Sequence, residues 1–267
     1  MLSEEALIKA CHTQWIAGCV RYYEEIDSTN SEAMRLAQQG APHGTLVVAN
    51  TQSMGQGRRG RSWESPVGST ISMTLLLRPS FAPNTAPMLT LVMALAVNHA
   101  IRELTGLESL IKWPNDIVVR GKKVCGILTQ MNLEAEHIDT VIIGVGINVN
   151  QSASMIAANL QQTATSLQLE TGHPIARVEL IAKIMYAYEQ YYDIFLQTED
   201  LSGLQPAYHS VLANLDSEVK VLDAQGEYTG IARGIDKQGE LLVQREDGLI
   251  TPVYAGEVSV RGLYGYV

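Results

Sequence analysis

The chain has 267 residues, 46% of them hydrophobic and 18% charged, which is typical of a folded globular protein. Its formal net charge of −9 argues against a nucleic-acid binder, because a phosphate backbone attracts basic surfaces. Three widely spaced cysteines, an odd number, indicate free thiols in a reducing compartment. The first residues lack a basic stretch followed by an apolar run, and no apolar run approaches the length of a membrane span. We therefore expect a cytoplasmic protein without a membrane partner.

Stretches typical of strands and of helices alternate from about residue 20 to residue 197, which predicts an α+β domain. β-branched residues and turn signals predict strands over residues 21–26, 45–49, 70–77, 110–112, 117–119, 124–131 and 140–143. Apolar periodicity predicts helices over residues 32–39, 87–104 and 177–196, and residues 8–18 are compatible with a helix. Ser28-Thr29-Asn30 is expected to cap the first of these helices.

After residue 206 the pattern becomes entirely β, and turn signals separate short strand-like segments. These segments cover residues 218–222, 228–232, 240–244, 249–253 and 258–260. Short strands so closely spaced predict a small barrel, closed so that no edge strand is exposed. We therefore divide the chain into a domain of residues 1–210 and a domain of residues 211–267.

The segment from Gly55 to Trp63 carries the strongest local signal for chemistry. It combines glycines, which let the backbone turn tightly, with arginines, whose forked cation suits phosphate and carboxylate groups. The segment also matches G-x-G-x-x-G and nearly matches a P-loop, but both motifs require a helix that starts at the last glycine. Pro66 and Gly68, followed by a predicted strand, argue against such a helix. Two interpretations are left, a loop that binds a small anion and a solvated basic turn.

Three further segments place polar groups near predicted strand ends. Lys112-Trp113-Pro114-Asn115-Asp116 surrounds a rigid Trp-Pro step with a cation and a carboxylate, and pairing of the neighbouring strands as a hairpin would bring Asp116 to face Lys123. Gly144-Val145-Gly146 offers a strand where a flat ring could approach the backbone, and Asn148 offers an amide to a base. Taken alone, the lysines are equally typical of solvated charges in turns, and the Gly144–Asn148 segment of a simple turn from a strand into a loop.

Other kinds of catalytic site find no support in the sequence. The six histidines are scattered and form no zinc-binding pattern, and no G-x-S-x-G elbow indicates a hydrolase serine. Cys125 lies between Val124 and Gly126, where a small apolar side chain would serve, so we interpret it as a packing residue rather than a nucleophile. No set of metal ligands is identified from the sequence.

In their order and spacing, the motifs together resemble those of one family, the biotin protein ligases. The resemblance extends from about residue 23 to residue 260, and the ordered set is far more specific than any one motif. It is carried by Asp27-Ser28-Thr29-Asn30, Thr51-Gln52, Gly55–Trp63, Lys112–Asp116, Lys123–Leu128, Gly144–Asn148, Gly230–Asp236 and Gly256–Val258.

The resemblance implies a fold related to class II aminoacyl-tRNA synthetases, a mixed and largely antiparallel sheet with flanking helices, followed by an SH3-like barrel. It also implies a reaction in two steps. Biotin attacks the α-phosphate of MgATP to give biotinyl-5′-AMP and pyrophosphate, and a lysine of a biotin carboxyl carrier protein then takes the biotin and releases AMP. Biotin, ATP, Mg2+ and the carrier protein are therefore expected, and monomer or homodimer is left open.

The resemblance also assigns residues. Lys123 and Arg58 are expected to be catalytic, because fixed cations must neutralise the charge that forms when a carboxylate meets a phosphate. The expected biotin contacts are Ser28, Thr29, Asn30, Gln52, Gly55, Gln56, Arg58, Lys123 and Gly126. The expected ATP and adenylate contacts are Arg58, Arg59, Arg61, Trp63, Lys112, Asn115, Asp116 and Asn148, with residues 151–165 as a loop that closes over the adenylate.

Two features depart from the family pattern. The family loop usually reads G-R-G-R-R-G, whereas Gln56 replaces its first arginine here. Only 26 residues precede Asp27, too few for the winged helix-turn-helix with which some members repress transcription. The chain therefore resembles the monofunctional form of the family, or a truncated bifunctional one, and we expect it to bind no DNA. The alternatives are a biotin-responsive repressor, a lipoate ligase, in which other residues follow the arginine pair, and a non-catalytic SH3-like adaptor.

Overall fold

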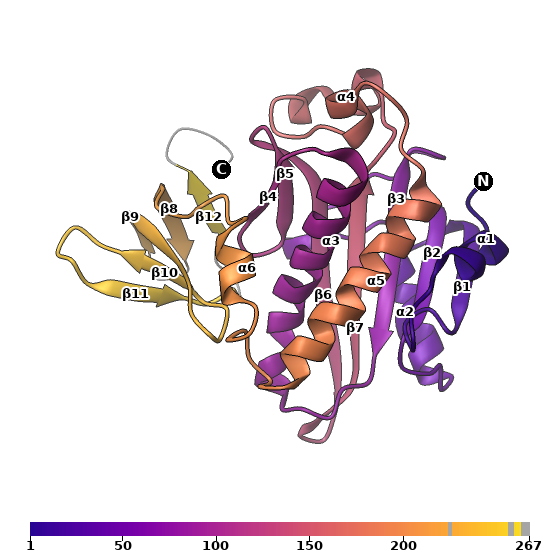
Figure 1. Cartoon of the computed structure of the whole chain (residues 1–267), viewed down its shortest axis with the longest axis horizontal. Coiled ribbons are helices and arrows are strands. Elements are labelled where there is room, and N and C mark those ends of the chain that lie inside the picture. The colour runs from indigo at the N-terminus through magenta and orange to yellow at the C-terminus, as the bar shows by residue number, and fades with distance from the viewer. Residues whose placement is uncertain (224–225, 256–258, 263–267) are drawn as a thin grey trace.

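A computed structural model describes residues 1–223, 226–255 and 259–262 of the chain (Figure 1). Its larger part is a seven-stranded sheet with the order β1-β2-β3-β7-β6-β5-β4, in which β1 and β2 are parallel and the other neighbours antiparallel. The strands are β1 (Val20–Ile26), β2 (Thr45–Gln52), β3 (Thr70–Leu77), β4 (Ser109–Lys112), β5 (Asp116–Val119), β6 (Lys122–Glu134) and β7 (His137–Asn148). The mixed sheet predicted for this part of the chain is confirmed.

Helices cover both faces of this sheet, because the central strands alternate apolar side chains to both sides. On β2, Leu46 and Val48 belong to the main core under α3 and α5, whereas Val47 packs in a separate cluster against α2. The site described below lies on the α2 face. The α-helices are α1 (Glu4–Ala10), α2 (Thr29–Gln38), α3 (Leu89–Thr105), α4 (Leu167–Thr171), α5 (Arg177–Leu196) and α6 (Gln205–His209). Short 3-10 helices cover Arg58–Gly60, Pro83–Met88, Ala153–Met155 and Ala158–Leu160.

The apolar helix α3 lies at the centre of the fold beside α5, as Figure 1 shows. Helix α3 ends where Gly106 adopts φ 69°, a left-handed conformation that glycine adopts without steric cost. The stretch Pro83–Thr105 is long and apolar enough to cross a membrane, but 78% of its most apolar window is buried inside the protein. Its apolar composition is therefore accounted for by core packing.

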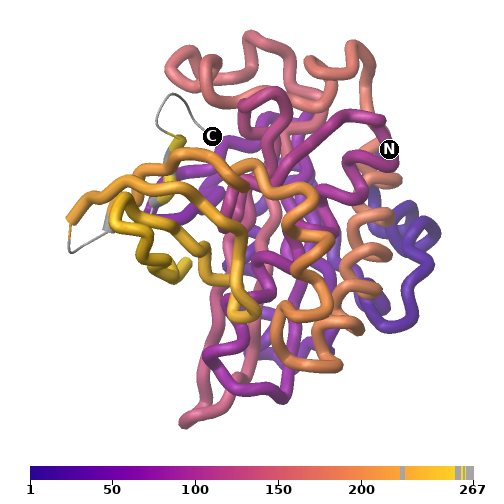
Figure 2. Tube along the Cα trace, turned by 60° about the vertical axis from the view of Figure 1, so that its left-hand side comes forward, coloured from indigo at the N-terminus to yellow at the C-terminus, as the bar shows by residue number. Residues whose placement is uncertain are grey.

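The C-terminal part is a five-stranded antiparallel sheet with the order β11-β10-β9-β8-β12, placed to one side of the large sheet (Figures 1 and 2). Trp113, which follows β4 of the large sheet, contacts this part of the chain, because its indole Nε1 donates a hydrogen bond to the carbonyl of Gly239 at 3.0 Å. The strands are β8 (Glu218–Asp223), β9 (Gly226–Ile235), β10 (Leu241–Gln244), β11 (Ile250–Val253) and β12 (Ser259–Gly262). This confirms the predicted small antiparallel β-domain, whereas its closure into a barrel stays a prediction. Residues 224–225 of a predicted turn and residues 256–258 of the quoted motif and last strand lie outside the described residues. The boundary at residue 210 stays a prediction.

Residues 8–18, whose sequence is compatible with a helix, do not form one helix. Helix α1 ends at Ala10, and the following residues form turns because the carboxylate of Glu189 on α5 binds their backbone. It accepts hydrogen bonds from the N–H groups of Gln14, Trp15 and Ile16 at 2.9–3.2 Å. Glu189 is 175 positions from Gln14 in the sequence, so the residues near Gln14 do not reveal this contact. Helix α5, which carries Glu189, has the predicted bounds.

Candidate functional site

Two rows of paired residues form the floor of a cavity on the α2 face of the large sheet. Gly126 on β6 pairs with Gly146 on β7, and Gly144 pairs with Leu128 in the next row on that face. Side chains of paired residues point to the same face of a sheet, and glycine has no side chain. The three glycines therefore let other side chains pack directly on the backbone, Trp63 on Gly146, Asn30 on Gly144 and Lys123 on Gly126.

The side chains that cover Gly144 and Gly146 lie too close to leave room for a Cβ atom at either position. A Cβ atom added to Gly146 would lie 2.7 Å from Nε1 of Trp63, and one added to Gly144 would lie 2.8 Å from Cγ of Asn30. Both distances are shorter than real Cβ contacts. Trp63 and Asn30 thus pack directly on the backbone of Gly146 and Gly144.

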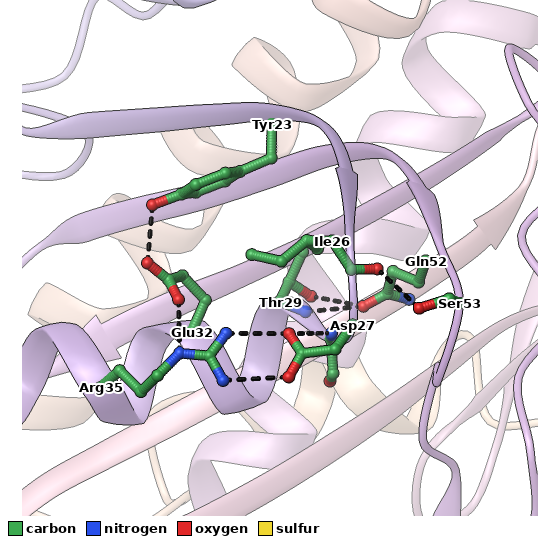
Figure 3. A network of polar contacts seen from close by, with 9 residues as sticks. Tyr23, Ile26, Asp27, Thr29, Glu32, Arg35, Gln52 and Ser53 are labelled. Carbon is green, nitrogen blue, oxygen red and sulfur yellow. Dashed lines mark hydrogen bonds and ion pairs between the residues drawn. The ribbon is translucent and has the colours of Figure 1, made fainter.

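Uncharged polar groups line one end of this first cavity. The backbone N–H and the hydroxyl of Thr29 donate to Oε1 of Gln52 at 2.7 and 3.0 Å (Figure 3). Nδ2 of Asn30 donates to Oε1 of Gln130 at 2.8 Å, and the hydroxyl of Thr74 lies 2.7 Å from Oδ1 of Asn30. Such a set of neutral donors and acceptors suits a polar but uncharged ring group.

An exposed ion-pair network holds the start of α2 beside this end. Arg35 binds Asp27 at 2.8 Å and Glu32 at 2.6 Å, and Tyr23 donates to Glu32 (Figure 3). Hydrogen bonds from Arg35 and from the backbone of Ser28 lower the pKa of Asp27 to about 2. Ser28 occupies the N-cap position as predicted, but its side chain makes no capping hydrogen bond and lines the cavity instead.

Cationic groups lie at the opposite end of the first cavity. Nζ of Lys123 is 2.6 Å from Oδ1 of Asp116 and 5.6 Å from the centre of the Trp63 ring. It also lies 2.9 Å from the place a Cβ atom of Gly126 would take, directly at the edge of the glycine floor. The facing of Asp116 and Lys123 predicted from the hairpin is confirmed.

Arg58 extends from the glycine-arginine loop into this region. Its guanidinium donates to Oδ1 of Asn115 at 2.8 Å and to the carbonyl of Ala255 at 2.9 Å. Burial lowers the pKa of Arg58, and the nearby Asp116 raises it. An arginine with an ordinary pKa far above neutrality stays charged under such a shift, so the guanidinium is a fixed cation in the site.

The glycine-arginine loop forms a small hairpin rather than a nucleotide-binding turn. Gly57 N donates to the carbonyl of Arg61 at 2.7 Å, and Trp63 N donates to that of Gly55 at 2.9 Å. The loop contains one turn of 3-10 helix, and the next regular element is strand β3. The missing α-helix confirms that the dinucleotide and P-loop matches were misleading.

A second cavity of about 640 Å3 adjoins the first. Both cavities are lined by Arg58, Trp63, Asn115 and Lys123. The second cavity adds a cationic lining of Arg59, Arg61 and Lys112, with Asp116, Gln162 and Thr163. A neutral compartment and a cationic compartment therefore meet at Lys123 and Arg58, where a carboxylate and a phosphate could be held together.

Most predicted site residues converge on these two cavities, but two do not line either one. Gly55 lies under the carbonyl of Trp63, and Asn148 is buried and donates to the carbonyl of Thr165 at 3.0 Å. Thr74 and Gln130 were not predicted as site residues, whereas Gly144 and Leu128 belong to segments that the sequence singled out. Alternation along β3, β6 and β7 from the predicted Gly126 and Gly146 would have found Thr74 and Gln130.

Cys125 is completely buried in the main core, and burial raises the pKa of its thiol. Its interpretation as a packing residue is confirmed. Within the part of the chain that the structure describes, no group of three or more His, Cys, Asp or Glu side chains is arranged to hold a metal ion.

Comparisons with known proteins agree with this architecture. Residues 22–148 match the model of the biotin/lipoate A/B protein ligase family, and residues 215–261 match that of the biotin protein ligase C-terminal domain. The bifunctional ligase/repressor BirA of Bacillus subtilis is 36% identical over 259 residues, which cover 97% of this chain and 79% of that protein. The biotin–[acetyl-CoA-carboxylase] ligase of Paracoccus denitrificans is 33% identical over 83% of this chain and 92% of its own length.

Solved structures give the same result. The biotin protein ligase of Aquifex aeolicus in complex with biotin and ATP superposes with a TM-score of 0.78 and 31% identity, over 92% of this chain and 99% of that one. Fold and site thus define a ligase domain of the biotin/lipoate class followed by a small β-domain. Within that class, the chain belongs to the biotin protein ligase family.

Proposed function

We propose that this chain activates biotin with ATP and transfers it to a lysine of a biotin carboxyl carrier domain, and that the two cavities carry out the first step. The observation that carries the proposal is the position of Lys123 and Arg58, at the junction of the glycine-floored neutral cavity and the cationic cavity. In the first step the biotin carboxylate attacks the α-phosphate of ATP and pyrophosphate leaves. Both reactants are anions, so fixed cations at the junction offset their repulsion.

The neutral end of the first cavity supplies the proposed biotin contacts. Thr29, Asn30 and Gln52, with Ser28, place donors and acceptors where the ureido group of biotin would bind. The remainder of the bicyclic ring would lie beside the Trp63 indole, which itself packs on Gly146. A lipoyl dithiolane has no such hydrogen-bonding group, and a site built around hydrogen bonds discriminates strongly against a ligand that lacks them.

The cationic cavity supplies the proposed nucleotide contacts. Arg58 and Lys123 would hold the α-phosphate, while Arg59 and Arg61 would face the leaving pyrophosphate. Magnesium would arrive on the phosphates of ATP as part of the substrate. Asn115 fixes Arg58, and the amide of Asn148, whose Nδ2 is held by the carbonyl of Thr165, would contact adenine.

In the second step the carrier lysine amine attacks the carbonyl of biotinyl-AMP, AMP leaves, and the nitrogen loses a proton. Asp116 and Lys112 pair across β4 and β5 at the rim of the second cavity. We propose that they organise the acceptor side, with Asp116 placed to accept a hydrogen bond from the incoming amine.

Isotope exchange tests the first step without a carrier. The wild-type protein is expected to exchange labelled pyrophosphate into ATP only when biotin is present, because exchange requires a reversible adenylate. Lipoic acid is the matched control substrate and is expected to support exchange at less than about one-thousandth of the biotin rate. Exchange that does not depend on biotin, or that lipoic acid supports equally, would contradict the proposal.

Gln56 is exposed on the loop and lines the first cavity, where the family pattern has arginine. Gln56→Arg is expected to slow dissociation of biotinyl-AMP by about tenfold, since one added charge-assisted hydrogen bond corresponds to roughly 1.4 kcal/mol. The measurement is release of labelled adenylate into an excess of unlabelled adenylate. Gln56→Met, which removes the amide without adding charge, is the control and should release at least as fast as wild type. Equal release by the arginine variant would refute the role given to position 56.

We propose further that this chain binds no operator DNA, on the support of its net charge of −9. We also propose that it acts in the cytoplasm, where ATP and reduced thiols are available. A gel shift with biotin-operon DNA, with and without biotinyl-AMP, is expected to show no complex at 150 mM salt (a concentration near the physiological value). A shifted band that requires biotinyl-AMP would identify a repressor.

A further inference from the structure

The segment that follows β7 returns to Lys123 and pairs with its backbone. Lys123 N donates to the carbonyl of Thr163 at 2.8 Å, and Thr165 N donates to the carbonyl of Lys123 at 2.9 Å. These two bonds form a parallel bridge between Lys123 and Ala164, while Val118 of β5 is paired with Lys123 as well. The backbone from which the Lys123 side chain extends is therefore fixed partly by residues 163–165.

Thr165 also contacts the proposed adenine residue. Its carbonyl accepts a hydrogen bond from Nδ2 of Asn148 at 3.0 Å, and Thr165 is only 4% exposed. One buried residue thus contacts the backbone of Lys123 through its N–H and the side chain of Asn148 through its carbonyl. A shift of Thr165 would move both the cation of the first step and the nucleotide contact.

Glu170 holds the side chain of Thr165. Oε1 of Glu170 accepts a hydrogen bond from the Thr165 hydroxyl at 2.7 Å, and Oε2 lies 3.2 Å from Nη1 of Arg120. Arg120 belongs to the turn between β5 and β6, three residues before Lys123. The Glu170 side chain is 11% exposed and that of Arg120 is 75% exposed, so the Thr165 bond is the better shielded of the two contacts.

Helix α4, which carries Glu170, is held in place by hydrogen bonds to the segment after β7. Ser166 caps α4 by accepting from Leu169 N, and its hydroxyl donates to the carbonyl of Gln151 at 2.7 Å. Gln168 N donates to the carbonyl of Val149 at 2.8 Å, directly after the end of β7. Glu170 is thereby attached to the strand that carries Asn148.

From these contacts we infer that Glu170 is a positioning residue for the formation of biotinyl-AMP. It holds Thr165, and through Thr165 it fixes the Lys123 backbone and the Asn148 amide in one arrangement. The inference rests on the proposed function, because its effect is read in the adenylation step. A charged acceptor forms a stronger hydrogen bond than a neutral one, but a glutamine acceptor keeps the geometry.

Steady-state adenylation by full-length variants tests this inference. Glu170→Ala is expected to lower kcat at least about tenfold and to raise the KM for ATP, while the Kd for biotin measured without ATP stays within about twofold of wild type. Glu170→Gln should recover most of the activity, and Arg120→Gln should stay within about threefold of wild type, since its ion pair is exposed. Thr165→Val should resemble Glu170→Ala, and the double variant should be no worse than either single variant.

Three results would overturn the inference. They are wild-type kinetics for Glu170→Ala, a loss of biotin affinity parallel to the loss of rate, and additive effects of Thr165→Val and Glu170→Ala. Wild-type kinetics would show that the Glu170 contact is dispensable. A parallel loss of biotin affinity would show general damage to the site, and additive effects would show that Thr165 and Glu170 act independently. Absence of adenylate with the wild-type protein would instead refute the proposed function, so the two failures are distinguishable.

Discussion

Lys123→Met is expected to slow formation of biotinyl-AMP by about 10²- to 10³-fold, the range found when one preorganised charge-stabilising group is removed. The ammonium lies at the edge of the glycine floor and 2.6 Å from Asp116, at the junction of the two cavities. Methionine keeps most of the side-chain volume and removes the charge. Rapid-quench measurement of labelled adenylate under saturating ATP reports the chemical step directly.

Biotin binding distinguishes this loss from a damaged pocket. The neutral end of the cavity, around Thr29 and Gln52, does not depend on Lys123, so biotin affinity without ATP should fall far less than the rate. Lys9→Met removes an exposed lysine on α1, outside both cavities, and should adenylate at the wild-type rate. An unchanged rate for Lys123→Met would show that this lysine does not stabilise the transition state.

Gly146→Ala is expected to lower kcat/KM for biotin by about 10²-fold, the cost of displacing a reacting group by roughly 1 Å. The new methyl group would lie 2.7 Å from Nε1 of Trp63 and would push the indole toward the space where the ring of biotin is proposed to lie. Trp63 belongs to a loop, so the expected response is displacement of the indole and not unfolding. Pyrophosphate exchange at varied biotin concentration measures the effect.

A second alanine variant controls for folding. Gly18→Ala places its methyl group 3.6 Å from the carbonyl of Trp15, an ordinary contact far from the site, and should leave exchange unchanged. Both variants should unfold at temperatures close to that of wild type, because alanine costs less backbone entropy than glycine. Wild-type kcat/KM for Gly146→Ala would show that the packing of Trp63 on Gly146 does not affect the ligand.

Strong local patterns were sufficient to predict most of the fold. The apolar periodicity of α5 predicted the observed bounds, and the β-branched run over residues 70–77 is strand β3. The hairpin that joins Asp116 to Lys123 was also predictable, because a short turn between two strands leaves few arrangements. These features depend on residues near one another in the chain.

The missed features depend on pairing between distant segments. Gly126, Gly144 and Gly146 were predicted one by one, but the alignment of Gly126 with Gly146 depends on the register of β6 and β7, which is not visible in either strand alone. The bond from Asn30 to Gln130 joins residues 100 positions apart. Likewise, the return of residues 163–165 to Lys123 is set by tertiary contacts and has no signal in local propensity.

Transfer of labelled biotin to a purified apo biotin carboxyl carrier domain tests the central claim most directly. With MgATP, the wild-type protein should label the carrier on one lysine, and a carrier with that lysine replaced by arginine should stay unlabelled. The Lys123→Met variant should label the carrier only slowly from biotin and ATP, because it forms little adenylate. A wild-type protein that forms neither biotinyl-AMP nor labelled carrier would contradict the assignment of this site to biotin transfer.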